Sequence, residues 1–182
     1  MGWNYKGNLK GPSGSDSALT TDQLRTLFGF EQYKQPPHGS LVWSGPWFNP
    51  PGNAFLRLRK FNNGRLVKGT ESTTSGKVVY DSDDNPCLVA PVDGLYLVSA
   101  TQCWGTDVGA KGCGLGTSTT SGLDGMVVWA DTSTRFASVS KVVFLRANTR
   151  LYPWTFSMPD AGMSPADRGI QSEYSITFLQ AI

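Results

Sequence analysis

The chain has 182 residues, enough for one sizeable domain, and its hydrophobic and charged fractions, 39% and 16%, are both low for a cytosolic protein. Glycine (21 residues), proline (11) and aromatic residues (12%, with six tryptophans) are abundant, which favours an all-β protein with many loops over a helical enzyme. The net charge of +2 is scattered, so nucleic-acid binding is not indicated, and no apolar stretch is long enough for a membrane-spanning helix.

Residues 1–17 are polar and glycine-rich, and they lack the charged and apolar regions of a secretory signal. We therefore expect a protein that is made in a cytoplasm and not exported. Trp3 and Tyr5 are the only large side chains of this segment, so it cannot form a core and is either disordered or held by a partner. Its two Gly-X-Y triplets, GPSGSD at residues 11–16, are too short for a collagen helix and are interpreted as a hinge behind an extended arm.

Residues 18–30 are predicted to form a short helix. Thr20 and Gln23 fit a capping box, and Gly29 provides the C-terminal stop. The apolar side chains that share one face of this helix are Leu24, Leu27 and Phe28. A helix of under three turns is marginal alone, so this face must dock either on its own domain, as a lid, or on a sister subunit.

A proline-rich connector completes the segment 18–39 and contains the single histidine, His38, which we expect to be a solvated loop residue. From residue 40 to the end, apolar and polar residues alternate, and Gly, Pro, Asn and Asp mark nearly every junction. The predicted strands are 40–44, 54–61, 77–82, 94–104, 125–132, 135–145, 149–156 and 173–182. Strands without intervening helices predict an antiparallel two-sheet jelly-roll sandwich over 40–182.

The tryptophans divide into two groups. Trp43 and Trp47 lie in a Pro/Gly-rich stretch, LVWSGPWFNPPG, where exposed rings could stack on sugars, although packing between subunits is the simpler interpretation. Trp104, Trp129 and Trp154 fall within predicted strands and are expected in the core or in a trimer interface.

No catalytic pattern is present. With one histidine and none of the usual nucleophile, phosphate-loop or zinc motifs, we predict no enzymatic activity, no cofactor and no metal. The glycine-rich run 112–116 is interpreted as a flexible or bulged strand pair. Asp81, Asp83 and Asp84 could ligate calcium but are more typical of a β-turn. A carboxylate pair for glycan cleavage is not excluded.

Three cysteines, Cys87, Cys103 and Cys113, make an odd number. Without a secretory signal we expect reduced, buried thiols. A bridge between Cys103 and Cys113 remains the alternative for a protein that ends outside a cell.

Residues 75–182 resemble the jelly-roll head domain shared by the complement first component and tumour-necrosis-factor-like proteins. Three family motifs carry the resemblance: Pro91, Gly94 and Tyr96; Ser140 to Leu145 with Ala147-Asn148 in place of the usual Gly-Asp; and Ser172, Tyr174 and Leu179. The resemblance implies a homotrimer, because in this family sheet faces that carry aromatic residues meet around a three-fold axis.

The N-terminal pattern is similar to that of virion proteins of actinobacterial phages, in which it precedes collagen-like or jelly-roll modules. The matching residues are Trp3, Tyr5, Lys6, Gly7, Lys10, Gly11, Pro12 and Gly14. A virion protein needs no export signal, because the host cell is lysed. The resemblance implies that Trp3, Tyr5, Lys6 and Lys10 anchor the chain to the particle.

These observations lead to three hypotheses. The first is a homotrimeric knob on the virion surface, as a capsid decoration, head-fibre or minor capsid protein, whose partners are itself and phage capsid or tail proteins. The second is a minor tail protein module that binds a host cell-wall glycan through Trp43 and Trp47. The third is an unrecognised glycan-cleaving enzyme.

Overall fold

The structure, a computed structural model, describes residues 36–45, 53–59, 64–73, 75–82, 84–107, 109–121, 124–158, 162–164, 166–167 and 170–182. The predicted arm and the predicted helix 18–30 lie outside these residues. The strands belong to one compact unit, Gln35–Ile182. Within the described part of the chain, no helix is long and apolar enough to cross a membrane.

The described residues form β-strands joined by turns, as the alternating pattern predicts. In chain order the strands are β1 (His38–Ser44), β2 (Ala54–Arg57), β3 (Arg65–Ser72), β4 (Val79–Tyr80), β5 (Cys87–Val89), β6 (Gly94–Trp104), β7 (Lys111–Gly116), β8 (Met126–Thr132), β9 (Phe136–Leu145), β10 (Arg150–Ser157), β11 (Met163–Ser164), β12 (Ala166–Asp167), β13 (Ile170–Gln171) and β14 (Glu173–Gln180). β12 and β13 pair only with each other.

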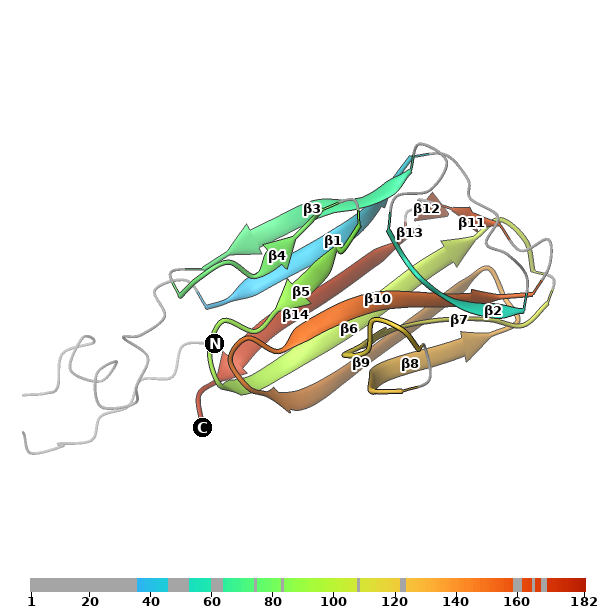
Figure 1. The fold of residues 1–182 in the computed structure, drawn as a ribbon. Helices are drawn as coiled ribbons and strands as arrows, with labels where there is room; N and C mark the ends of the chain where they lie inside the picture. The colour runs from blue at the N-terminus through green and yellow to red at the C-terminus, as the bar shows by residue number, and fades with distance from the viewer. Residues whose placement is uncertain are drawn as a thin grey trace, which may run out of the picture. The chain divides into compact units, whose positions relative to one another are not determined.

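Two antiparallel sheets make up the sandwich (Figure 1). In the first sheet the strands follow the order β3–β1–β14–β6–β9, and β11 pairs with the end of β6. In the second sheet the order is β4–β5–β10–β7–β8. β2 pairs with the second half of β10, on the same side of that strand as β5. Except for β4–β5 and β7–β8, strands that are neighbours in a sheet are not consecutive in sequence, which is the jelly-roll arrangement that the sequence predicts.

The core lies between the two sheets and is formed by alternate residues of each strand. The residues of β6 at 96, 98 and 100 are fully buried, whereas those at 95, 97 and 99 are half-buried on the other face. The first sheet contributes Leu41, Tyr96, Val98, Tyr174 and Ile176 to the core, and the second contributes Val79, Leu88, Cys113, Leu115 and Leu151.

A buried polar bridge joins the two sheets. The Tyr174 hydroxyl donates to Oε1 of Gln102, and Nε2 of Gln102 donates to Oγ1 of Thr155 over 2.9 Å. The Thr155 hydroxyl donates in turn to the carbonyl of Gly112 over 3.2 Å. Burial raises the pKa of Tyr174 well above its usual value, so this hydroxyl remains a neutral donor. The bridge fixes β14 and β6 against β10 and β7.

Glu71 connects the edge strand β3 to the second sheet. One carboxylate oxygen accepts the backbone N–H groups of Val78 and Val79 over 2.9 and 3.0 Å, and the other pairs with Lys68. Burial alone would raise the pKa of Glu71, but these hydrogen bonds outweigh it and lower the pKa. The carboxylate therefore stays ionised and closes this edge of the sandwich.

The glycine-rich run forms one strand, β7, which pairs with β8 and β10, and the β7–β8 pair has a register shift at Leu115/Gly116, as the bulged alternative of the prediction expects. Gly112, Gly114 and Gly116 alternate and all face outward. A Cβ at Gly112 would lie 2.4 Å from the indole of Trp129, so the glycines clear a path for this ring across the strand. Glycine is needed here for close approach, not for flexibility.

The turn 146–149 accounts for the missing Gly-Asp of the family pattern. Asn148 adopts a φ of 65°, a left-handed conformation that asparagine tolerates better than most residues. Asp93, on the turn that precedes β6, accepts a hydrogen bond from the backbone N–H of Ala147 over 2.6 Å. The left-handed conformation of Asn148 and the hydrogen bond from Ala147 to Asp93 thus form a tight turn without the glycine of the family pattern.

Candidate self-association face

The outer face of the first sheet carries the largest exposed apolar side chains of the described strands. In the pairing of β6 with β9, Leu95 lies opposite Phe144 and Leu97 opposite Val142. Val142 is 51% and Phe144 48% exposed, whereas the intervening residues of β6 are buried in the core. The strict alternation of β6 therefore places an apolar strip of β6 and β9 on the surface.

The C-terminal strand extends this strip. Phe178 is 6% exposed and packs on Tyr96 in the core with a ring distance of 5.3 Å, so alternation turns Leu179, which is 48% exposed, to the outer face. Beyond the bulge at the end of β14, Gln180 pairs with Leu95. We name as the apolar patch the residues Leu95, Leu97, Val142, Phe144 and Leu179.

Next to the apolar patch, the same face is lined by hydroxyl groups. The Oγ atoms of Ser99 and Ser140 are 2.8 Å apart, and Oγ1 of Thr101 is 2.8 Å from Oγ of Ser138. Each pair shares one hydrogen bond across β6 and β9, so this half of the face is polar without an ionised group from these two strands.

His38 was expected to be a solvated loop residue, and this was wrong. It begins β1 and is half-buried, with Nδ1 2.7 Å from Oγ1 of Thr177 and Nε2 2.9 Å from Oγ1 of Thr70. The ring therefore connects β14, β1 and β3 across the outer face. The strand begins two residues earlier than predicted because His38 and Gly39 already pair with β14 and β3, which are remote in sequence.

Most of the predicted site residues lie outside the described residues: Trp3, Tyr5, Lys6, Lys10, Leu24, Leu27, Phe28 and Trp47. The exception is Trp43, whose ring the glycan hypothesis requires to be exposed. It lies in β1 and is 1% exposed, so its ring cannot stack on a sugar. The hypothesis of a glycan site built on Trp43 and Trp47 therefore loses one of its two residues.

The remaining tryptophans follow the prediction in part. Trp104 (fully buried) and Trp154 (3% exposed) belong to buried parts of the domain, whereas Trp129 is half-buried on the outer face of the second sheet. All three cysteines are buried as thiols, as expected, and the alternative bridge between Cys103 and Cys113 is not present. Burial raises the pKa of Cys113 to about 12, so this thiol is not poised for nucleophilic chemistry.

Metal binding finds no support among the described residues, in which no group of three or more His, Cys, Asp or Glu side chains could hold an ion. Of the Asp cluster, Asp81 and Asp84 are described and Asp83 is not.

Sequence reasoning placed Leu95, Leu97 and Ser99 on one face of their strand but did not identify this face as the outer one. The signal was available in β9, where the residues of one face, at 138, 140, 142 and 144, are two serines followed by two apolar residues. An outward strip that is apolar over half its length departs from the polar exterior of an ordinary sandwich.

The described part of the chain has the tumour-necrosis-factor-like jelly-roll fold. It is similar to the solved structures of murine APRIL at pH 8.0, pH 5.0 and pH 8.5, with TM-scores of 0.56, 0.52 and 0.52 and sequence identities of 10%, 12% and 10%. In each case the match covers 80% of this chain and 100% of the APRIL chain. No protein-family profile and no characterised protein sequence matches the chain.

Proposed function

We propose that the protein is a non-enzymatic structural homotrimer that assembles through the apolar patch. The observation that carries this proposal is the contiguous exposure of Val142 and Phe144 beside Leu95 and Leu97. Contiguous apolar patches on the surface of a soluble protein mark interaction sites, because leaving them in water forfeits the free energy of burying them. Scattered single residues would not carry this argument.

Two further observations support a self-association role for this face. The tumour-necrosis-factor-like fold belongs to a family that forms trimers, and the aromatic residue that such an interface needs is present here as Phe144. The hydroxyl pairs beside the patch, such as Ser99 with Ser140, each use one O–H donor within the sheet, so a neighbouring subunit that covers them has to supply an acceptor for at most one donor per pair.

We further propose that the trimer is a knob on a phage virion, held by the N-terminal arm. This proposal rests on the N-terminal sequence pattern, in which Trp3 and Tyr5 would insert into a capsid or tail protein and Lys6 and Lys10 would pair with its acidic groups. Three arms on one rigid trimer bind far more tightly than one arm, because the second and third attachments are intramolecular.

The trimer is tested by size-exclusion chromatography with light scattering. The wild-type chain is expected at three times the monomer mass, and the Phe144→Lys and Val142→Lys variants at the monomer mass with an unchanged circular dichroism spectrum. Met158→Lys is the matched control, because Met158 is 40% exposed but follows β10 of the other sheet. A monomeric wild type, or variants that remain trimeric, would contradict the proposal.

The attachment is tested separately by deleting residues 1–17. The truncated chain should remain trimeric but fail to bind purified virions that the full-length chain decorates. Equal binding by both chains would exclude the arm as the anchor while leaving the trimer unaffected.

A further inference from the structure

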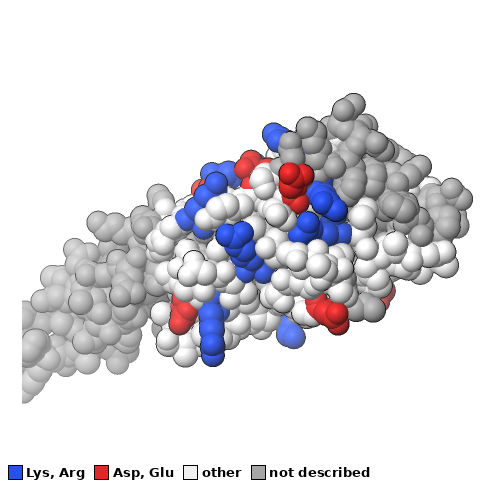
Figure 2. Space-filling view, viewed as in Figure 1, with Lys and Arg blue, Asp and Glu red and all other residues white. Residues whose placement is uncertain are grey.

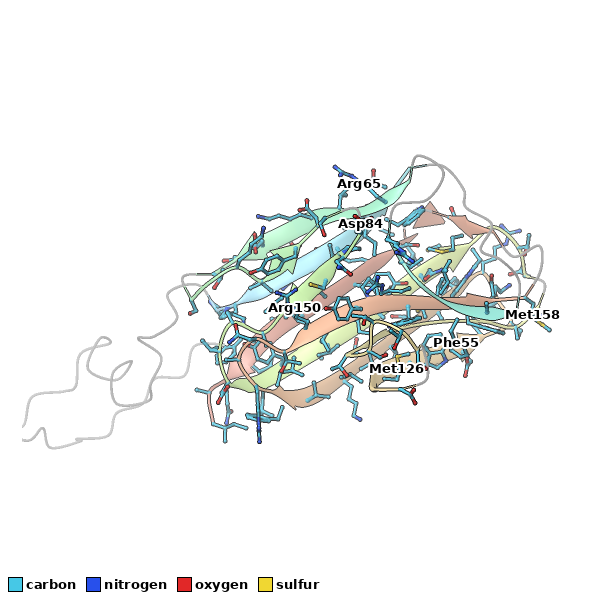
Figure 3. All side chains as sticks on the ribbon, viewed as in Figure 1. Phe55, Arg65, Asp84, Met126, Arg150 and Met158 are labelled. Carbon is cyan, nitrogen blue, oxygen red and sulfur yellow. The ribbon has the colours of Figure 1, made fainter. Side chains whose placement is uncertain are left out.

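Three cations gather on the outer face of the second sheet, on the opposite side of the sandwich from the apolar patch. Nζ of Lys77 lies 4.6 Å and Cζ of Arg150 5.5 Å from the centre of the Tyr80 ring. Cζ of Arg57 lies 5.4 Å from the centre of the Tyr152 ring. We name Arg57, Lys77 and Arg150 the cationic cluster. Figure 2 shows Lys and Arg gathered over β5 and the adjacent end of β10, where Figure 3 labels Arg150.

The rings of Tyr80 and Tyr152 lie on the same outer face of the second sheet and form, with Cys87, the floor beneath the cations. Tyr80 pairs with Cys87, which packs with Tyr152, so two tyrosines flank a buried thiol in a row across β4, β5 and β10. The positive charges of Arg150, Arg57 and Lys77 all act on the Cys87 thiol and lower its pKa, although burial, the larger effect, leaves the pKa raised overall. Cys87 thus lies within range of the charges of all three cations, although these come from three separate segments of the chain.

The cations are held by aromatic rings and not by carboxylates. Within the described residues, no ion pair joins any member of the cationic cluster to an acidic side chain. Among the described residues of the neighbouring β4–β5 turn, which are 81, 82 and 84–86, Arg57 bonds the backbone carbonyl of Asp84, 3.4 Å from Nη2, and neither carboxylate of Asp81 and Asp84. Nε of Arg57 is buried and has no hydrogen-bond partner among the residues that the structure describes.

Such an arrangement is costly in isolation. A buried N–H donor without an acceptor and three like charges on one sheet face both reduce stability, and the contacts of the cations with the tyrosine rings offset only part of this loss. An anion bound between Arg57, Lys77 and Arg150 would accept hydrogen bonds from these side chains. It would also reduce the repulsion between their positive charges. The forked guanidinium groups and the ammonium group present donors from several directions, which suits an anion with oxygens on all sides.

We propose that the cationic cluster binds a tetrahedral oxyanion, a phosphate or sulfate group, either as the free ion or as an ester on a larger molecule. Arg57 and Arg150 hold its oxygens by forked hydrogen bonds and Lys77 adds the third charge. The tyrosine floor positions the three side chains before the anion arrives, which lowers the entropy lost on binding. The site is independent of the proposed trimer, because it lies on the other sheet.

The test is isothermal titration of the full chain with sodium phosphate and sodium sulfate at constant ionic strength, with sodium chloride and sodium acetate as reference salts. Saturable binding of phosphate or sulfate is expected, with neither reference salt competing at equal concentration. Arg57→Gln, Arg150→Gln and Lys77→Gln should each weaken binding at least tenfold. Lys141→Gln is the charge-matched control, because Lys141 is exposed on β9 of the first sheet, and it should bind as the wild type does.

The conservative variant Arg150→Lys separates ligand binding from folding, because it keeps the charge and the long side chain but lacks the fork. It should fold normally and bind phosphate with intermediate affinity. A titration with glycerol 3-phosphate distinguishes the two sources: tighter binding of inorganic phosphate assigns the site to the free ion, and equal or tighter binding of the ester assigns it to an esterified group. Absence of saturable phosphate and sulfate binding, or equal weakening by Lys141→Gln, would overturn the proposal.

Discussion

The alternating glycines of β7 provide a graded test of the packing on the second sheet. A Cβ at Gly114 would lie 2.1 Å from the carbonyl oxygen of Val128 and 3.1 Å from Cα of Trp129, which are backbone atoms. A Cβ at Gly112 would lie 2.4 Å from Cζ2 of the Trp129 ring, which is a side chain. At Gly116 the nearest atom would be 3.2 Å away. The three glycines share one strand and one face, so they differ mainly in what a methyl group meets.

The expected free energies follow from these contacts. Overpacking costs about 1–3 kcal/mol, and replacing glycine by alanine returns about 0.4–1 kcal/mol because the unfolded chain is restricted. Gly114→Ala cannot be relieved by a rotamer change, so it should lose about 3 kcal/mol or more of the free energy of unfolding. Gly112→Ala should lose about 1–2 kcal/mol, because the indole can move, at the expense of its hydrogen bond to Asp131. Gly116→Ala should lie within about 1 kcal/mol of the wild type.

The measurement is urea unfolding followed by tryptophan fluorescence, at one fixed protein concentration because association also stabilises the fold. The order of stability should be wild type and Gly116→Ala, then Gly112→Ala, then Gly114→Ala. If Gly114→Ala were as stable as Gly116→Ala, the close approach of β8 to β7 would not exist, and the interpretation of the glycines as packing residues would be refuted.

Two further predictions concern the buried polar and thiol groups. Tyr174→Phe removes the donor to Gln102 and leaves a buried acceptor unpaired, so urea unfolding should show a loss of about 1–3 kcal/mol; an unchanged stability would mean that the bridge does not cross the core. Because the pKa of Cys113 is raised from 9.0 to about 12, the folded state keeps a proton that the unfolded state loses, and stability should fall as the pH rises above about 9. The slope of unfolding free energy against pH in this range should be smaller in Cys113→Ala, and equal slopes would contradict the buried position.

The strands whose local pattern is strong were predicted well from sequence. β6 runs from Gly94 to Trp104, the predicted bounds, because Pro91 and the Asp93-Gly94 turn fix its start and strict alternation follows. The closing strand, β14, was also found, since its aromatic and β-branched residues alternate without interruption. Where one face is buried along a whole strand, period two is sufficient to identify it.

The strands that were missed have patterns set by their neighbours. β3 carries Lys68, Gly69 and Glu71 and lacks an apolar period, because it is an edge strand whose outer side is open. β5 has only three residues, all buried, which no alternation can reveal. β7 looked like a flexible segment because its glycines match the Trp129 ring of another strand, a fact absent from the local sequence.

Both candidate sites combine residues that are remote in sequence, so the local sequence pattern could not reveal them. The apolar patch joins β6, β9 and β14, and the cationic cluster joins Arg57, Lys77 and Arg150 from three segments of the second sheet. In the sequence these cations are scattered, which is why charge patterning indicated no anionic partner. The expectation about His38 was wrong for a related reason, since its partner Thr177 is 139 residues away.

The placement of the two surfaces on opposite sheets has a consequence for how they act together. A trimer that buries the outer face of the first sheet must leave the outer face of the second sheet accessible, because a side chain of a sandwich faces one side only. Each trimer would then present three cationic clusters outward. A single phosphate ion binds one cationic cluster, so its affinity does not depend on whether the protein is a trimer. A polymer with several phosphate or sulfate ester groups binds more than one cluster of the same trimer, which raises its apparent affinity. The two proposals can therefore fail separately, and only together do they predict that Phe144→Lys weakens the binding of a polyanion while leaving that of inorganic phosphate unchanged.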